Sequence, residues 1–178
     1  MDDGSIFMIV ALIILIGLSA FFSAAETAYN SLNEIRLRSK AEDGDAKAAH
    51  TLALVERYDS LLSTILIGNN IVNLSASSLM TTLTLRLFGN AAVGVATGVL
   101  TLLILVFGEI TPKTMSTLYA EKISFAYAGI IHVLMVVLTP VIVIVNKLSM
   151  GVLFLLRVDP NNCLLYTSPS PRDYAASR

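Results

Sequence analysis

Long apolar runs alternate with short polar segments along the 178-residue chain. Residues 5–28, 59–87 and 91–107 approach the ~20 apolar residues that cross a bilayer as a helix. Residues 123–157 form a fourth apolar run, with Pro140 near its middle. This pattern predicts an all-α membrane protein in which the first three runs are transmembrane helices.

The fourth run leaves two topologies open. A straight helix of its length would measure roughly 52 Å, well beyond a hydrocarbon core of ~30 Å. The run is therefore either one long kinked helix or a hairpin that turns at Pro140 and returns to the side it came from. Lys122 and Arg157 flank both ends and favour the hairpin, because basic residues stay on the cytoplasmic side. We expect a Pro-kinked helical hairpin on the cytoplasmic side of the membrane.

The polar segment at residues 29–57 separates the first two apolar runs. Its pattern predicts amphipathic juxtamembrane helices with a break near Asp43-Gly44-Asp45. Because basic residues mark cytoplasmic segments, the N-terminus is predicted to lie outside a multi-pass protein of the cell (inner) membrane. The basic residues of this segment are Arg36, Arg38, Lys40, Lys47 and Arg57.

Composition supports the membrane class and narrows the function. Apolar residues make up 55% of the chain and charged residues 14%, whereas about a quarter of the residues of a soluble domain are charged. The net charge of −1 gives no electrostatic footprint for nucleic acid. The sequence shows no P-loop and no nucleophile with a base, so we do not expect an enzyme. His132 stands alone in an apolar stretch and is expected to pack or to lie at the interface.

The C-terminal segment is expected to be foreign to the fold. Cys163 to Asp173 resembles a translated transposase sequencing adapter rather than a natural Ser/Pro-rich tail. Residues 163–178 are therefore predicted to be adapter-derived and disordered, and the transmembrane domain to occupy residues 4–158. Because Cys163 is the only cysteine and lies in this segment, no thiol chemistry is inferred.

Three asparagines interrupt the second apolar run. A buried amide costs a few kcal/mol unless a partner bonds it, so carboxamides at membrane depth need a reason. Asn69 and Asn73 are four residues apart and share one helix face, while Asn70 points elsewhere. The shared face is either half of a hard-cation site or a polar helix–helix contact.

A second polar group follows the third apolar run, at Gly108-Glu109-Ile110-Thr111-Pro112-Lys113. The Pro112 ring clashes with the carbonyl four residues earlier, which belongs to Gly108. We therefore expect a freed carbonyl oxygen beside the Glu109 carboxylate at membrane depth. In the alternative interpretation, Glu109 pairs with Lys113 and the asparagines hold helices together, although Pro112 disturbs the helix that this pair requires.

The donor atoms at membrane depth are almost all oxygens. Ser23 adds a hydroxyl to the amides, the carbonyl and the single carboxylate. The absence of His and Cys from this group disfavours zinc, copper and iron. The set suits a hard cation such as Mg²⁺, Ca²⁺ or Na⁺.

Three motifs together resemble the transmembrane domain of the CNNM/CorC family of magnesium transporters. They are Phe22–Ala28, Ile67–Asn73 and Gly108–Lys113, in this order and spacing, and the resemblance covers residues 4–158. It implies a homodimer in the lipid bilayer that exports Mg²⁺, with Na⁺ coupling proposed. By motif position it also implies a dehydrated Mg²⁺ site, with ligands from Ser23, Asn69, Asn73, Glu109 and the Gly108 carbonyl.

The same resemblance implies cytoplasmic CBS domains that bind ATP, which are expected to be missing here; ATP is therefore not assigned to this chain. One rival function is a non-transporting membrane anchor, or cation sensor, for such CBS domains. A second is a haemolysin-like membrane toxin, against which the internal polar site and the basic segment argue.

Overall fold

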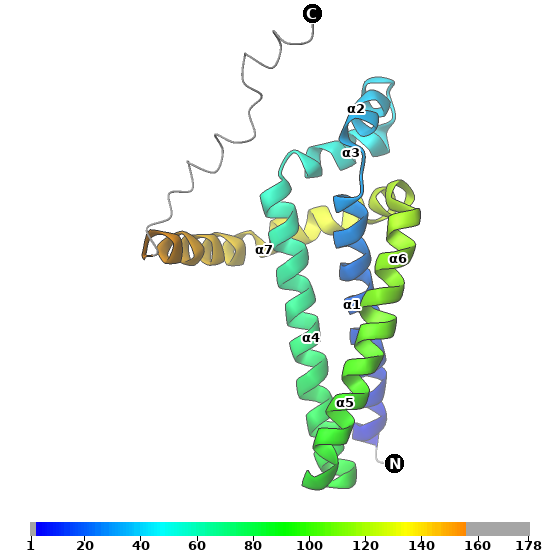
Figure 1. Cartoon of the computed structure of the whole chain (residues 1–178), viewed down its shortest axis with the longest axis vertical. Coiled ribbons are helices and arrows are strands. Elements are labelled where there is room, and N and C mark those ends of the chain that lie inside the picture. Colours follow the sequence, from blue (N-terminus) through cyan, green and yellow to red (C-terminus); the bar gives the residue numbers. More distant parts are fainter. Residues whose placement is uncertain (1–2, 156–178) are drawn as a thin grey trace, which may run out of the picture. The chain divides into compact units, whose positions relative to one another are not determined.

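The computed structural model describes residues 3–155, and this part of the chain contains helices and no strand (Figure 1). The predicted all-α membrane class is confirmed, whereas the prediction for residues 163–178 lies outside the described residues. The elements are α1 (Asp3–Asn30), α2 (Glu34–Glu42), α3 (Ala46–Val55), α4 (Tyr58–Phe88), a 3₁₀ turn η1 (Asn90–Ala92), α5 (Val93–Leu103), a π-helical segment η2 (Ile104–Ile110), α6 (Thr111–Leu118) and α7 (Ala120–Leu155).

Four helical stretches are long and apolar enough to span a bilayer: Asp3–Asn30, Tyr58–Phe88, Asn90–Leu118 and Ala120–Val152. The first two match the predicted apolar runs closely. The third extends past the predicted end near residue 107, because helical backbone continues through η2 and α6. Pro112 lies in the first turn of α6, directly after the π-helical segment, so it does not end the helical backbone.

The prediction of a hairpin at Pro140 is wrong, since α7 remains helical through Pro140. A membrane helix tolerates an internal proline, because small backbone adjustments and neighbouring groups compensate the lost hydrogen bond. The other interpretation left open by the sequence, one long helix containing Pro140, matches the secondary structure.

The chain divides into two units, Met1–Leu138 and Thr139–Arg178. In the first unit, α1 packs lengthwise against α4, and it also packs against η2 and α6 (Figure 1). Phe22, Leu61 and Ile65 lie in a buried cluster where α1 and α4 meet. The same cluster takes in Leu54 of α3 and Ile131 of α7, so both helices pack on the end of the α1–α4 pair.

Short polar caps define the α2–α3 hairpin. The Asn33 side chain accepts a hydrogen bond from the Arg36 N–H and starts α2. Asp45 does the same for the first turn of α3, after Gly44 has adopted a φ of 93°. The predicted break near residues 43–45 is therefore confirmed.

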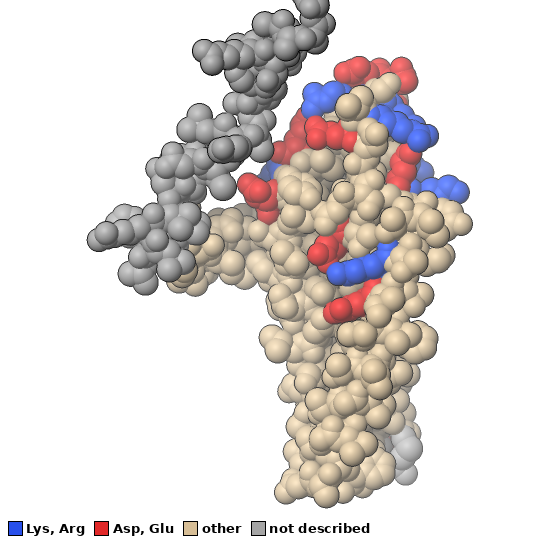
Figure 2. Space-filling model, in the orientation of Figure 1, with Lys and Arg blue, Asp and Glu red and all other residues tan. Residues whose placement is uncertain are grey.

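Charged side chains gather on one part of the molecule. On the face shown in Figure 2, most Lys, Arg, Asp and Glu residues lie over α2, α3 and the adjoining helix ends, while the part around α5 is almost free of them. Exposed apolar residues cover the long helices, among them Ile13, Leu74, Val95 and Leu102. An apolar surface of this kind is stable in contact with lipid.

The closest approach of α1 to α4 depends on Gly68. A Cβ atom at this position would lie 2.4 Å from the ring of Phe22, so we expect Gly68→Ala to lower the stability of the detergent-solubilised chain by about 1–3 kcal/mol, the usual cost of overpacking. Gly17→Ala is the matched control, because nothing lies within 4 Å of its Cβ position. Thermal unfolding compares the two variants, and equal stability would contradict the packing described here.

Candidate functional site

The asparagine cluster of α4 faces a serine of α1. The Ser19 hydroxyl donates a hydrogen bond to Oδ1 of Asn73 at 2.9 Å and lies 3.4 Å from Oδ1 of Asn69. A hydroxyl carries one proton, so the shorter contact is the stronger bond. Asn70 is exposed, as the helical spacing predicts. The helix face carrying Asn69 and Asn73 is thus turned toward α1.

The π-helical segment completes this group from a third direction. Gly108 is buried, and a Cβ atom at this position would lie 3.0 Å from the Ser19 hydroxyl oxygen. A side chain here would force Ser19 to shift, so the glycine allows the η2 backbone to lie this close to α1. The disturbance that the sequence predicted around Gly108 takes the form of a π-helix, a feature that often occurs at functional sites.

Ser23 lies one helical turn beyond Ser19 on α1 and is fully buried. Its hydroxyl has no hydrogen-bond partner among the described residues. An unsatisfied buried hydroxyl costs about 1–3 kcal/mol, so a native structure needs a reason to keep one. A ligand of this hydroxyl supplies such a reason.

Glu109 and Asn73 line the same cavity, of about 230 Å³, between α4 and α5–η2. The remaining lining residues are Ser77, Thr97, Leu100, Thr101, Ile104 and Leu105. Thr97 and Thr101 donate their hydroxyl protons to carbonyls of their own helix, so their oxygens can still accept or coordinate. The cavity therefore combines one carboxylate with neutral oxygens.

The alternative in which Glu109 pairs with Lys113 is wrong. Nζ of Lys113 lies 3.3 Å from a carboxylate oxygen of Glu26, and this ion pair joins α6 to α1. The π-helical turn at residues 104–110 separates Glu109 from the regular turn that an i,i+4 pair requires. In residues 3–155, Glu109 makes no ion pair, which leaves its carboxylate available to a cation in the cavity.

Four of the five predicted ligands lie in one connected cluster. Asn69, Asn73 and Gly108 surround Ser19, and Glu109 shares its cavity with Asn73. Ser23 is buried one helical turn beyond Ser19, and its hydroxyl has no hydrogen-bond partner among the described residues. The ligand assignment itself stays a prediction, because these contacts describe a polar cluster and not a bound ion.

Sequence reasoning missed the central role of Ser19. The available signal was the four-residue spacing of Ser19 and Ser23, which puts two hydroxyls on one helix face. That spacing equals the spacing of Asn69 and Asn73 on the facing helix. Neither spacing by itself predicts that the serine face of α1 contacts the asparagine face of α4.

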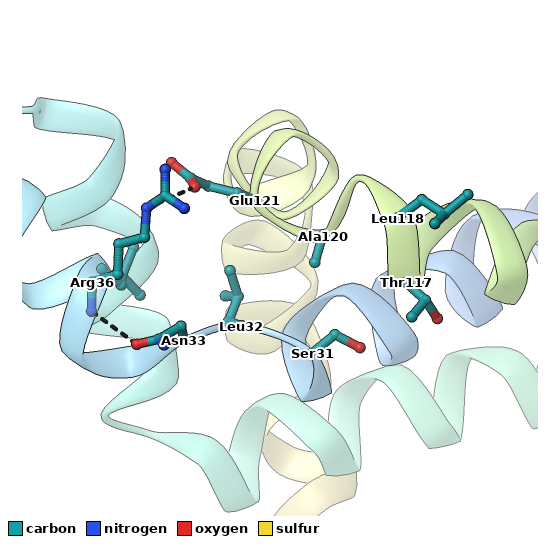
Figure 3. A pocket seen from close by; sticks show the side chains of 9 residues that line it. Ser31, Leu32, Asn33, Arg36, Thr117, Leu118, Ala120 and Glu121 are labelled. Atoms are coloured by element: carbon teal, nitrogen blue, oxygen red, sulfur yellow. Dashed lines mark hydrogen bonds and ion pairs between the residues drawn. The ribbon is translucent and has the colours of Figure 1, made fainter.

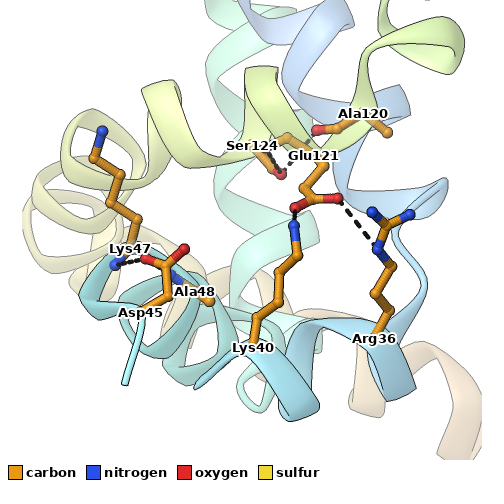
Figure 4. A network of polar contacts seen from close by, with 8 residues as sticks. All are labelled: Arg36, Lys40, Asp45, Lys47, Ala48, Ala120, Glu121 and Ser124. Carbon is orange, nitrogen blue, oxygen red and sulfur yellow. Dashed lines mark hydrogen bonds and ion pairs between the residues drawn. The ribbon is translucent and has the colours of Figure 1, made fainter. Parts of the chain in front are cut away.

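A second cavity of about 230 Å³ lies at the connection between α1 and α2, with residues of α6 and the start of α7 in its wall (Figure 3). Its charged residues already pair with each other, because Arg36 Nε lies 3.7 Å from Glu121. Glu121 also pairs with Lys40, so two basic residues of α2 are tied to α7 (Figure 4). This cavity contains none of the predicted cation ligands, and we interpret its ion pairs as an anchor for α2.

Comparison with known proteins places this geometry in a family. Residues 10–169 match the family described as cyclin M transmembrane N-terminal domain. A UPF0053 protein of Haemophilus influenzae is 45% identical over 139 residues, which cover 78% of this chain and 33% of that protein. A UPF0053 inner membrane protein of Escherichia coli is 41% identical over 132 residues, covering 74% of this chain and 31% of its own length.

A DUF21 domain-containing chloroplast protein of Arabidopsis thaliana is 39% identical over 145 residues, covering 82% of this chain and 22% of that protein. The chain thus spans a third or less of the length of these curated relatives.

Replacing Ser19 tests the polar contact between α1 and α4. Ser19→Ala removes the only donor that the structure gives to Oδ1 of Asn73 in the described part of the chain, so we expect a loss of about 1 kcal/mol in stability. Ser75→Ala is the control, because the Ser75 hydroxyl donates only to a carbonyl of its own helix. Chemical unfolding in detergent measures both variants; an equal effect would show that the Ser19–Asn73 bond contributes nothing specific.

Proposed function

The chain belongs to the family of cyclin M transmembrane N-terminal domains, and on this basis we propose that it transports Mg²⁺ across the membrane, in the direction of efflux. The family is one of multi-pass membrane domains and not of enzymes, and a relative carries the name inner membrane protein. We place this chain in the same kind of membrane, with its N-terminus outside.

One observation carries the proposal. Oxygen-bearing groups from α1, α4 and η2 are gathered inside a bundle whose outer surface is apolar, and one of them, the Ser23 hydroxyl, is buried without a partner. Irregular backbone and unpaired polar groups at membrane depth persist where they line a cavity or hold a ligand. Glu109 supplies the formal negative charge beside that group.

The chemistry of these donors favours Mg²⁺ over softer ions. Mg²⁺ takes six oxygen ligands at about 2.1 Å and gives up its water reluctantly. We propose Ser23, Asn69, Asn73, Glu109 and the Gly108 carbonyl as the replacements for that water. The Asn73 amide oxygen that accepts from Ser19 is already oriented toward the α1–α4 interface, and its second lone pair is available to the ion.

The same contacts suggest how access to the site could alternate. Small residues allow helices to slide, and Gly108 presents backbone to α1 with no side chain between them. The Glu26–Lys113 ion pair also joins α1 to the α6 end of the third span. We propose that α1 and the third span move against α4 around the fixed site, with Na⁺ as the coupling ion.

We also propose that the chain works as a homodimer. The Gly94 and Gly98 pair of α5 is exposed, and no atom of the described chain lies within 4 Å of either Cβ position. Asn70 is likewise exposed, on a helix long and apolar enough to span the membrane. Small residues permit close approach of a second copy, and a carboxamide in lipid gains from an interhelical hydrogen bond.

Transport assays on the site variants test the proposed function. We expect Glu109→Gln and Asn73→Ala to lower Mg²⁺ efflux from loaded proteoliposomes at least tenfold, because the first removes the negative charge of the site and the second removes an amide oxygen that replaces water. Ser75→Ala is the matched control on α4 and should retain efflux within about twofold, since the exposed Ser75 hydroxyl donates only to a carbonyl of its own helix.

The results of these assays distinguish a wrong ligand assignment from a wrong function. Efflux that survives both site substitutions would remove Glu109 and Asn73 from the ligand set. Mg²⁺ binding that depends on both residues, in a chain that gives no efflux, would favour the alternative of a membrane anchor and cation sensor.

Bulk at the exposed glycines tests the dimer. We expect the Gly94→Leu/Gly98→Leu double variant to shift the protein in mild detergent from dimer to monomer, as measured by light scattering after size-exclusion chromatography. Gly17→Leu adds the same bulk on α1, where nothing lies within 4 Å, and should leave the mass unchanged. A monomeric wild-type chain would contradict the homodimer.

A further inference from the structure

The two histidines of this chain lie side by side, although 82 positions separate them in the sequence. His50 belongs to α3 and His132 to α7, and both side chains are exposed. Nε2 of His50 lies 3.2 Å from Nδ1 of His132, and the ring centroids are 5.3 Å apart. We propose that this pair is a binding site for a divalent transition-metal ion of the Zn²⁺ class, separate from the Mg²⁺ site.

The separation of the two nitrogens suits a shared ion. Two imidazole nitrogens bound to one tetrahedral Zn²⁺ at about 2.0–2.1 Å lie about 3.3 Å from each other. The observed 3.2 Å between the His50 and His132 nitrogens differs little from that spacing. Small rotations of the two exposed rings are enough to aim both lone pairs at one ion in place of the present hydrogen bond.

Metal binding would change the tautomers of the two rings. In the hydrogen-bonded pair, one of the two facing nitrogens carries the proton that the other accepts. Metal binding requires both rings in the neutral tautomers that have their protons on Nδ1 of His50 and Nε2 of His132. The ion then replaces the shared proton as the link between the rings.

The surrounding structure holds the helices that carry the two rings against each other. Leu54 of α3 is buried in one cluster with Ile131 and Met135 of α7, so apolar packing fixes α3 against the helix that carries His132. On the α2 side of the hairpin, Lys40 pairs with Glu121 at the start of α7 (Figure 4). An ion at the histidines adds a direct cross-link between α3 and α7, close to the apolar contact.

The donor chemistry separates this site from the proposed Mg²⁺ site. Imidazole nitrogens suit Zn²⁺, Ni²⁺ and Cu²⁺, whereas Mg²⁺ takes oxygen ligands. The described residues contain no group of three or more His, Cys, Asp or Glu side chains that could hold a metal. The remaining coordination positions are therefore left to ligands other than these side chains, such as water.

Zinc titration of the purified chain tests the site. The protein carries Cys163→Ser and no polyhistidine tag, so that the two imidazoles are the chain's only strong nitrogen or sulfur ligands. With Zn²⁺ as the probe and excess Mg²⁺ present, calorimetry should show one ion per chain. His50→Gln and His132→Gln should each weaken binding at least tenfold, while Lys47→Gln on α3 should leave it within twofold.

The double variant distinguishes one shared ion from two separate sites. If both rings hold one ion, the His50→Gln/His132→Gln protein loses little affinity beyond either single variant, because each single change already abolishes chelation. With Cu²⁺ in place of Zn²⁺, the electron paramagnetic resonance spectrum of the unsubstituted protein should show nitrogen hyperfine splitting from two imidazoles. That two-imidazole splitting should be lost in each single variant and in the double variant. Additive losses, or Zn²⁺ binding that survives both substitutions, would overturn the proposal, as would the absence of saturable binding at millimolar Zn²⁺.

Discussion

A polar group inside a membrane domain must find its partners within the protein, because lipid offers none. In this chain the constraint falls on the hydroxyls of α1 and the carboxamides of α4. The bond from Ser19 to Asn73 satisfies part of it and fixes which faces of the two helices meet. Phe22 against Gly68 on the same interface then sets how closely the helices approach. Gly108 of η2 packs against the same site, because its missing side chain leaves room for Ser19.

The polar groups of this cluster that have no partner in the protein determine which ligand it suits. The Ser23 hydroxyl is buried without a partner, and Glu109 keeps its carboxylate free because Lys113 pairs with Glu26 instead. A carboxylate, two amide oxygens and a hydroxyl make a poor structural core but a suitable set of ligands for a hard cation. Within this set the Ser23 hydroxyl is buried, whereas Asn69, Asn73 and Glu109 are half-buried.

The sequence predicted the elements well where one signal dominates. Apolar runs gave α1 and α4 to within about two residues, a boundary error typical of such predictions, and Gly44 marked the break between α2 and α3. It failed where two effects compete. Pro112 and Pro140 carry a helix-breaking signal, yet the first lies in the first turn of α6 and the second lies inside α7. Ser19 and the His50–His132 pair could not be predicted, because their meaning depends on contacts between segments far apart in the chain.

The central claim is that the oxygens gathered around Ser19 and Glu109 bind a hard divalent cation. Anomalous diffraction from crystals grown in lipid with Mn²⁺, a substitute for Mg²⁺ that scatters strongly, tests it most directly. The account predicts one peak between α1, α4 and η2, at bonding distance from the amide oxygen of Asn73 and the carboxylate of Glu109. A map with no peak there, in which Ser19 still donates to Asn73, would show that the cluster only joins helices.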